Sequence, residues 1–148
     1  MTNNEIYFAA SISGGRQDVD IYLQLIEYLK NYGTVLTEHI GDKELSVKGE
    51  YQTDSFVHDR DMSWLSRAHI VVAEVTTASL GVGYELGRIV ERNGQLREKD
   101  RKSILCLHRP SVNKRLSAMI AGCPGIINKE YQTFEDAIKY IDEFLVGM

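Results

Sequence analysis

The sequence has few cysteines and no long apolar run, and both absences restrict what the protein can be. Its two cysteines, Cys106 and Cys123, are too few for a disulfide framework or a cysteine metal cluster. No stretch approaches the ~20 apolar residues that cross a bilayer. The N-terminus also lacks the basic region and apolar stretch of a secretory signal. We therefore expect a protein of the cytoplasm, and also of the nucleus, that has no membrane partner.

Excess positive charge and metal-ligand spacing are also missing. The chain of 148 residues carries a formal net charge of -4, so we expect no nucleic-acid partner. A small anionic ligand is still compatible with this charge, because it needs only a local positive potential. The four histidines (His39, His58, His69 and His108) are scattered, and none has ligand spacing with another acid or a cysteine. We expect neither a metal nor a cofactor.

Apolar runs alternate with helical patterns along the whole chain, which is long enough for one domain spanning residues 1–148. The patterns predict strands at 6–12, 34–38, 69–75, 102–108 and 126–129, and helices at 18–31, 54–68, 83–93, 111–122 and 133–145. The polar segment 41–53 is expected to be a loop. Strands separated by helices of this length predict an α/β fold, with a parallel five-stranded sheet and helices on both faces.

Ligands of such sheets bind beyond the carboxyl ends of the strands. Two segments at such positions, one around Ile12 and one after Val75, are rich in Gly, Ser and Thr. The first, Ser11-Ile-Ser-Gly-Gly-Arg16, lies between a predicted strand and a helix, where backbone N–H groups can hold an anion. Arg16 would add a positive charge. The segment matches neither GxxxxGKS/T nor GxGxxG, so a turn that simply needs glycine is the alternative.

Two carboxyl groups are candidates for catalysis. A rotation of ~100° per residue places Asp61 among apolar residues on one face of the helix at 54–68. Burial there would raise its pKa, as suits a general acid, although a buried structural aspartate is the alternative. Glu85 follows the glycine-rich "SLGVG", and we expect it in the first turn of a helix, where the anion is stabilised. Carboxyl groups in such different environments are typical of glycosyl transfer.

Several segments together indicate a family. The segments IYFAASISGGR, TVLTEH, HDRDMSWLSRAHIVVAEVTTASLGVGYELG, ILCLHRP and RLSAMIAG extend over residues 6–122. Jointly they resemble the 2'-deoxynucleoside 5'-monophosphate N-hydrolases, which are relatives of the nucleoside 2-deoxyribosyltransferases. The resemblance implies a Rossmann-like or flavodoxin-like fold. It also implies hydrolysis of the N-glycosidic bond of a nucleotide to a free base and 2-deoxyribose 5-phosphate.

The resemblance also implies roles for individual residues. Glu85 would be the nucleophile that attacks C1' and forms a glycosyl-enzyme intermediate. Asp61 would assist departure of the base and then activate water, and Tyr7 would orient Glu85 and contact the sugar. The predicted substrate-binding residues are Ser11, Ile12, Ser13, Gly14, Gly15, Arg16, His39, Ser79, Gly81 and Ser117. Ser117 matches a serine that reaches the phosphate of the neighbouring subunit, which predicts a homodimer with composite sites.

Ser79 bears on the choice between a nucleotide and a nucleoside as substrate. The transferases have an acidic residue near this position that binds the sugar hydroxyls, and its charge would repel a phosphate. Ser79 offers an uncharged donor, which favours a 5'-phosphorylated substrate. Ser13 stands where relatives have arginine, so Arg16 would have to supply the positive charge.

Three alternative functions are open. They are a nucleoside 2-deoxyribosyltransferase, a ribonucleoside monophosphate N-hydrolase of the CMP type, and a non-catalytic nucleotide-binding module. The combination of Tyr7, Asp61 and Glu85 argues against the last, because binding alone does not need these three residues.

Overall fold

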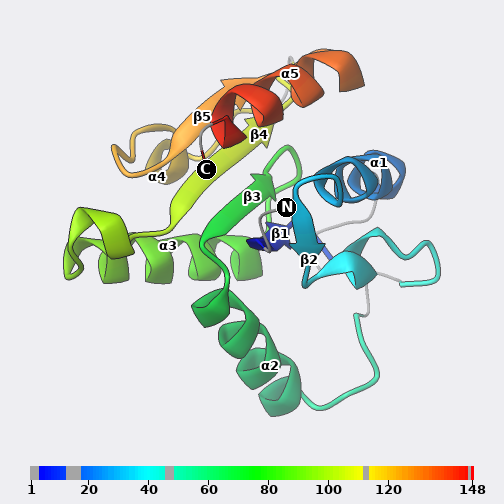
Figure 1. Cartoon of the computed structure of the whole chain (residues 1–148). Coiled ribbons are helices and arrows are strands. Elements are labelled where there is room, and N and C mark those ends of the chain that lie inside the picture. The colour runs from blue at the N-terminus through cyan, green and yellow to red at the C-terminus, as the bar shows by residue number, and fades with distance from the viewer. Residues whose placement is uncertain (1–3, 13–17, 46–48, 112–113, 147) are drawn as a thin grey trace.

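A parallel sheet of five strands forms the centre of the computed structural model, which describes residues 4–12, 18–45, 49–111, 114–146 and 148 (Figure 1). The strands are β1 (Asn4–Ala9), β2 (Gly33–Val35), β3 (Ile70–Glu74), β4 (Ser103–His108) and β5 (Ile127–Glu130). Their order is β2-β1-β3-β4-β5, and every neighbouring pair is parallel. This is the flavodoxin-like strand order. The predicted α/β fold is confirmed.

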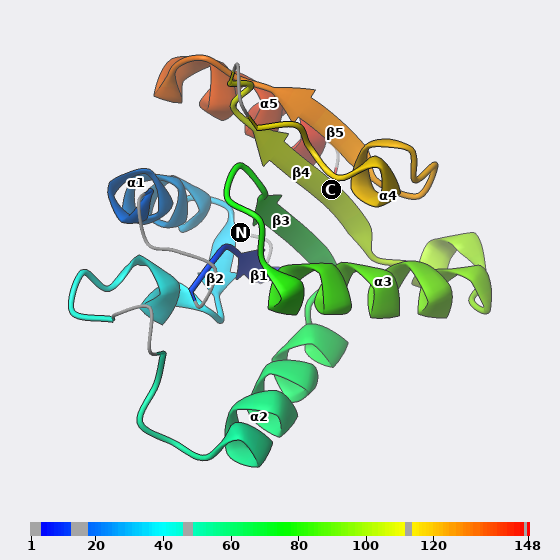
Figure 2. The same ribbon diagram turned by 180° about the vertical axis from the view of Figure 1, so that it is seen from behind.

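Helices cover both faces of the sheet (Figures 1 and 2). One face is covered by α1 (Val19–Leu29) and α5 (Phe134–Leu145), and the other by α3 (Leu80–Gly94) with the C-terminal end of α2 (Asp54–Arg67). The remaining helical segments are α4 (Ala118–Ala121) and the 3-10 turns η1 (Glu38–Gly41) and η2 (Glu98–Asp100). No helix in the described ranges is long and apolar enough to cross a membrane.

The central strands are mostly apolar because both of their faces are buried. All five residues of β3 are buried. In β1, Ile6 and Phe8 belong to the core under α1 and α5, whereas Tyr7 and Ala9 belong to the core under α3. This alternation directs Tyr7 toward the helix that carries Glu85.

Close pairing of β1 with β2 requires glycine at position 33. A Cβ atom there would lie 2.2 Å from the carbonyl oxygen of Asn4, the residue opposite Gly33 in the register. Just beyond β2, the buried hydroxyl of Thr37 donates to the Phe8 carbonyl oxygen at 2.6 Å and accepts from the Phe8 amide at 2.9 Å. These contacts fix where η1, which carries His39, leaves the sheet.

The prediction of a helix over 111–122 is wrong for most of the residues described there, which exclude 112 and 113. Among them, helix is confined to Ala118–Ala121, and Ser117 starts this turn by accepting a hydrogen bond from the Met119 amide at 3.2 Å. The described residues of α4 include no buried side chain. Short helices depend on packing of an apolar face for their stability, and this segment has little to bury.

The core under α1 gives a test of the fold. Leu25 is fully buried on α1, so Leu25→Ala should lower the free energy of unfolding by about 2–5 kcal/mol, through lost burial and a new cavity. Gln24→Ala, at the neighbouring exposed position, should change it by less than about 0.5 kcal/mol. Urea denaturation at one protein concentration measures both. Equal effects of the two substitutions would contradict this packing.

Candidate active site

Tyr7 and Glu85 meet in the core between β1 and α3. Tyr7 is only 1% exposed, and its hydroxyl is hydrogen-bonded to the Glu85 carboxyl group. Within the part of the chain that the structure describes, Oε2 of Glu85 is buried and has no hydrogen-bond partner. An unpaired buried carboxyl oxygen costs free energy. Tyr7 thus supports the Glu85 carboxylate on one side, and Oε2 is a candidate contact for a ligand.

The surroundings of Glu85 differ from the expectation. Ser79 is the N-cap of α3, because its hydroxyl accepts from the Val82 amide at 3.3 Å, and the helix begins at Leu80. Glu85 thus lies in the second turn, beyond the reach of the helix N-terminus. Burial raises the pKa of Glu85 to about 7, and the charge of Asp61 adds to the rise, while the bond from Tyr7 opposes it. The prediction that the site favours the charged form of Glu85 is wrong.

Asp61 lies on α2, with its side chain 23% exposed. Burial raises the pKa of Asp61, and hydrogen bonds from Arg60 oppose this rise. The pKa of Asp61 is therefore raised as expected, but the pKa of Glu85 is raised by more. Asp61, Glu85 and Tyr7 are close enough for their charges to interact.

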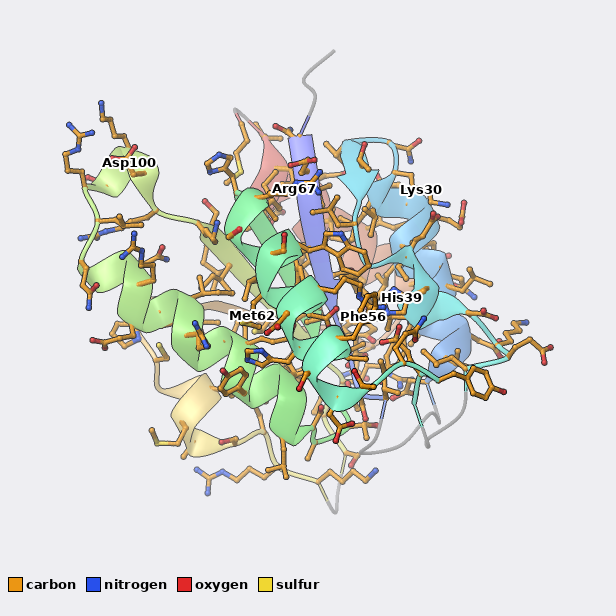
Figure 3. All side chains as sticks on the ribbon, turned by 90° about the horizontal axis from the view of Figure 1, so that it is seen from below. Lys30, His39, Phe56, Met62, Arg67 and Asp100 are labelled. Atoms are coloured by element: carbon orange, nitrogen blue, oxygen red, sulfur yellow. The ribbon has the colours of Figure 1, made fainter. Side chains whose placement is uncertain are left out.

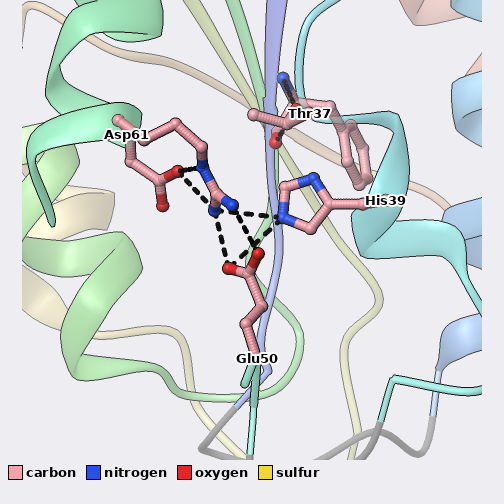
Figure 4. Close-up of polar contacts among 6 residues, drawn as sticks. Thr37, His39, Glu50 and Asp61 are labelled. Carbon is pink, nitrogen blue, oxygen red and sulfur yellow. Dashed lines mark hydrogen bonds and ion pairs between the residues drawn. The ribbon is translucent and has the colours of Figure 1, made fainter. Parts of the chain in front are cut away.

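A polar network adjoins Asp61 (Figure 4). Arg60 donates to Oδ1 of Asp61 at 3.0 Å and 2.9 Å, and to both oxygens of Glu50 at 2.5 Å and 2.6 Å. His39 on η1 lies 3.6 Å from Glu50, and burial lowers the pKa of its imidazole. In Figure 3, α2 has Met62 on the side toward α3, and Phe56 on the side toward His39.

Arg60 and Glu50 were not expected from the sequence. The available signal was the spacing of Phe56, Arg60 and Trp64, which places an arginine between two aromatic residues one helical turn away on either side. The guanidinium carbon of Arg60 lies 4.6 Å from the Trp64 ring centroid and 5.9 Å from that of Phe56. No local pattern marked Glu50, which follows a polar segment.

The predicted phosphate-binding residues fall into two groups. Ser79 and Gly81 lie at the start of α3, where a Cβ atom on Gly81 would lie 3.8 Å from the Ser79 hydroxyl oxygen. Ser11 is completely buried after β1, and Ile12 packs partly buried against the core under α1. Ser13, Gly14, Gly15 and Arg16 lie outside the described residues. Ser117 lies apart, as the exposed N-cap of α4.

Glu74, at the carboxyl end of β3, is a buried carboxyl group that no sequence pattern had indicated. It accepts from the Thr76 amide at 2.6 Å and from the Tyr131 hydroxyl. Burial raises its pKa. Arg109 donates from its amide to the Thr76 hydroxyl at 2.9 Å and pairs with Asp18 before α1. These bonds tie together the segments that follow β1, β3, β4 and β5, at the edge of the sheet where the candidate site lies.

Among the described residues, no group of three or more histidine, cysteine, aspartate or glutamate side chains could hold a metal ion. The candidate site itself brings together carboxyl groups, the Tyr7 hydroxyl and the Arg60 cation.

Comparison with solved structures bears on the fold. A Clostridium botulinum CMP N-glycosidase superposes with a TM-score of 0.67 over 96% of this chain and 100% of its own, at 16% identity. At this identity the likeness supports the α/β fold alone.

Sequence relatives are much closer. The chain is 54% identical over 140 residues to the 5-hydroxymethyl-dUMP N-hydrolase of Danio rerio, covering 93% of this chain and 92% of the relative. It is 51% identical over 120 residues to the protein of the same name from Tetraodon nigroviridis, covering 80% and 79%. The family model described as nucleoside 2-deoxyribosyltransferase matches residues 6–97, more than half of the chain. The protein thus belongs to the nucleoside 2-deoxyribosyltransferase family.

Proposed function

We propose that the protein hydrolyses the N-glycosidic bond of 2'-deoxynucleoside 5'-monophosphates, releasing a free base and 2-deoxyribose 5-phosphate. The observation that carries the proposal is the meeting of Tyr7, Glu85 and Asp61, with one buried oxygen of Glu85 left unpaired. Relatives that cover nearly the whole chain are named as N-hydrolases of a deoxynucleotide, which agrees with this chemistry.

In the proposed first step, the Glu85 carboxylate attacks C1' and forms an ester bond to the sugar. The bond from C1' to the base nitrogen breaks, and the base leaves with a proton from Asp61. The Tyr7 hydroxyl holds Glu85 in position through its hydrogen bond. In the second step, Asp61 takes a proton from water, whose oxygen attacks C1' and releases Glu85. The proton of Asp61 is thereby restored.

The proposed phosphate contacts come from the loops after β1 and β3. Ser79 and Gly81 would contribute a hydroxyl group and backbone amides, together with Ser11, Ser13, Gly14, Gly15 and Arg16. Ile12 and His39 would contact the rest of the substrate. A serine in place of a carboxylate at position 79 avoids repulsion of the phosphate, which is why a phosphorylated substrate is favoured.

We further propose that residues 1–148 act as one domain in a homodimer of the cytoplasm and the nucleus. Ser117 would contact the phosphate bound by the partner subunit. In the proposed dimer the partner would cover Leu80 on α3 and Met119 on α4, which are 97% and 83% exposed.

The first test is substrate choice. Incubation with 5-hydroxymethyl-dUMP and dGMP should release free base without any acceptor. GMP, and deoxyguanosine with added adenine, should react much more slowly. Glu85→Gln should lower the rate by on the order of 10³-fold or more, because a nucleophile is lost. Glu91→Gln, at an exposed position on the same helix, should keep the wild-type rate of base release. Activity only on deoxyguanosine with adenine would instead identify a transferase.

The second test is pH dependence. The reaction needs Glu85 charged and Asp61 protonated, so the productive form carries one proton on this coupled pair. Because the pKa of Glu85 is about 7, the last proton leaves the pair near that pH, and kcat/KM should fall above it. At low pH a second proton should quench Glu85, which makes the profile bell-shaped.

Asp61→Asn supplies the control for the pH test. Without Asp61 the residual kcat/KM should rise with pH and level off at or below about pH 7, because only Glu85 then titrates. A wild-type profile that rises through pH 7 to a plateau would show that Asp61 is not the proton donor.

The third test addresses the shared site. Mixing Glu85→Ala and Ser117→Ala subunits should restore activity, because a mixed dimer contains one site with both residues intact. Random mixing predicts about a quarter of the wild-type activity. The separate variants, kept at the same total concentration, give the baseline. No gain on mixing, despite exchange of subunits, would exclude a composite site.

A further inference from the structure

Arg60 joins three separate parts of the chain at the candidate site. Its guanidinium group contacts Asp61 on its own helix, Glu50 in the segment before α2, and His39 on η1, whose Nε2 is 3.5 Å from Nη2. The ring of Trp64 lies beneath it at 4.6 Å. The side chain is only 18% exposed, so it is fixed on several sides (Figure 4).

Glu50 completes this arrangement. Its carboxylate, 12% exposed, accepts one hydrogen bond from each terminal nitrogen of Arg60, which is the bidentate geometry that a guanidinium favours. The remaining nitrogen, Nε, and one terminal nitrogen both donate to Oδ1 of Asp61. Arg60 is therefore oriented by Glu50 and in turn orients Asp61.

We propose that Arg60, held by Glu50, is the positioning residue for Asp61: it fixes the carboxyl group through Oδ1 and leaves Oδ2 to exchange a proton with the base and with water. The inference rests on the proposed function, in which Asp61 is the proton donor. Proton transfer requires a donor held at hydrogen-bond distance in one orientation, and a free aspartate side chain would rotate between several.

The same contacts influence the charge of Asp61. Arg60 lowers the pKa of Asp61, whereas the negative charge of Glu50 raises it. The other titratable groups facing Asp61 are His39 on η1, Glu85 on α3 and Tyr7 on β1. Removal of Arg60 and neutralisation of Glu50 must therefore shift the pKa of Asp61 in opposite directions.

The kinetic test compares Arg60→Gln, Arg60→Lys and Glu50→Gln with the control Arg67→Gln. Arg67 is on the same helix but pairs at the surface with Glu5. Arg60→Gln should lower kcat by on the order of 10- to 100-fold with little change in KM, and move the acid limb of the kcat/KM profile to higher pH. Glu50→Gln should move that limb to lower pH. Arg67→Gln should change neither.

Arg60→Lys separates geometry from charge. Lysine keeps the positive charge but lacks the planar guanidinium that contacts Glu50 and Asp61 at once. The acid limb should therefore stay at its wild-type pH, whereas kcat should be as low as in Arg60→Gln. If Arg60 acted by charge alone, Arg60→Gln would leave more of the pair in the productive form, with its proton on Asp61, and kcat/KM would rise. That rise, or full activity of Arg60→Lys, would overturn the positioning role.

A measurement without substrate separates this inference from the proposed function. The carboxyl ¹³C resonance of Asp61, titrated in labelled protein, should report a higher pKa in Arg60→Gln and a lower one in Glu50→Gln than in wild type. Circular dichroism identifies any variant that has not folded. Opposite shifts in a protein that releases no base would refute the function and keep the Arg60–Glu50–Asp61 contact. Unchanged or parallel shifts would overturn the inference, whatever the activity.

Discussion

Desolvation of the Glu85 carboxyl group is the constraint on which the rest of the site depends. The helix α3 packs against the sheet through buried apolar residues, and Glu85 leaves the same helix into that core beside Tyr7. A buried carboxyl group holds its proton unless a donor or a cation supports the anion. Here the support is one tyrosine hydroxyl, itself almost completely buried on the central strand β1. Asp61 is a second carboxyl group close enough to interact with Glu85, so the two groups titrate as a coupled pair.

The second carboxyl group, Asp61, is supported in a different way and by other parts of the chain. Its cation is Arg60, and that cation is itself held by Glu50 and lies on Trp64. The site is thus built from two halves. One half comes from the sheet and α3, and the other from α2 and the segment before it. The two halves touch where Nε2 of His58 on α2 lies 2.9 Å from the Tyr84 hydroxyl on α3. The charges of the carboxyl groups and Tyr7 also interact across the site, which is why their protonation states are linked.

Periodicity in the sequence was sufficient to predict the sheet, both helical layers and the inward face of α2 that carries Asp61. It was insufficient where a contact joins distant segments. The pairing of Glu50 with Arg60 depends on how the segment before α2 folds back, and no local pattern specifies that path. The start of α3 at Leu80 depends on the cap at Ser79, and this shift moved Glu85 out of the first turn and reversed its expected charge preference. The roles of individual residues are still predictions.

The way in which α2 is attached has a consequence for how such a site can diversify. The helix is anchored at its C-terminal end, where Leu65 and Ala68 are buried, while Phe56 and most of the first two turns are exposed. Substitutions on an exposed helix face usually cost little stability. The first turns of α2, which precede Asp61, can therefore accumulate changes without disturbing the core beside Glu85. Under the proposed function, such changes would alter which base is accepted and leave the attack of Glu85 on the sugar constant.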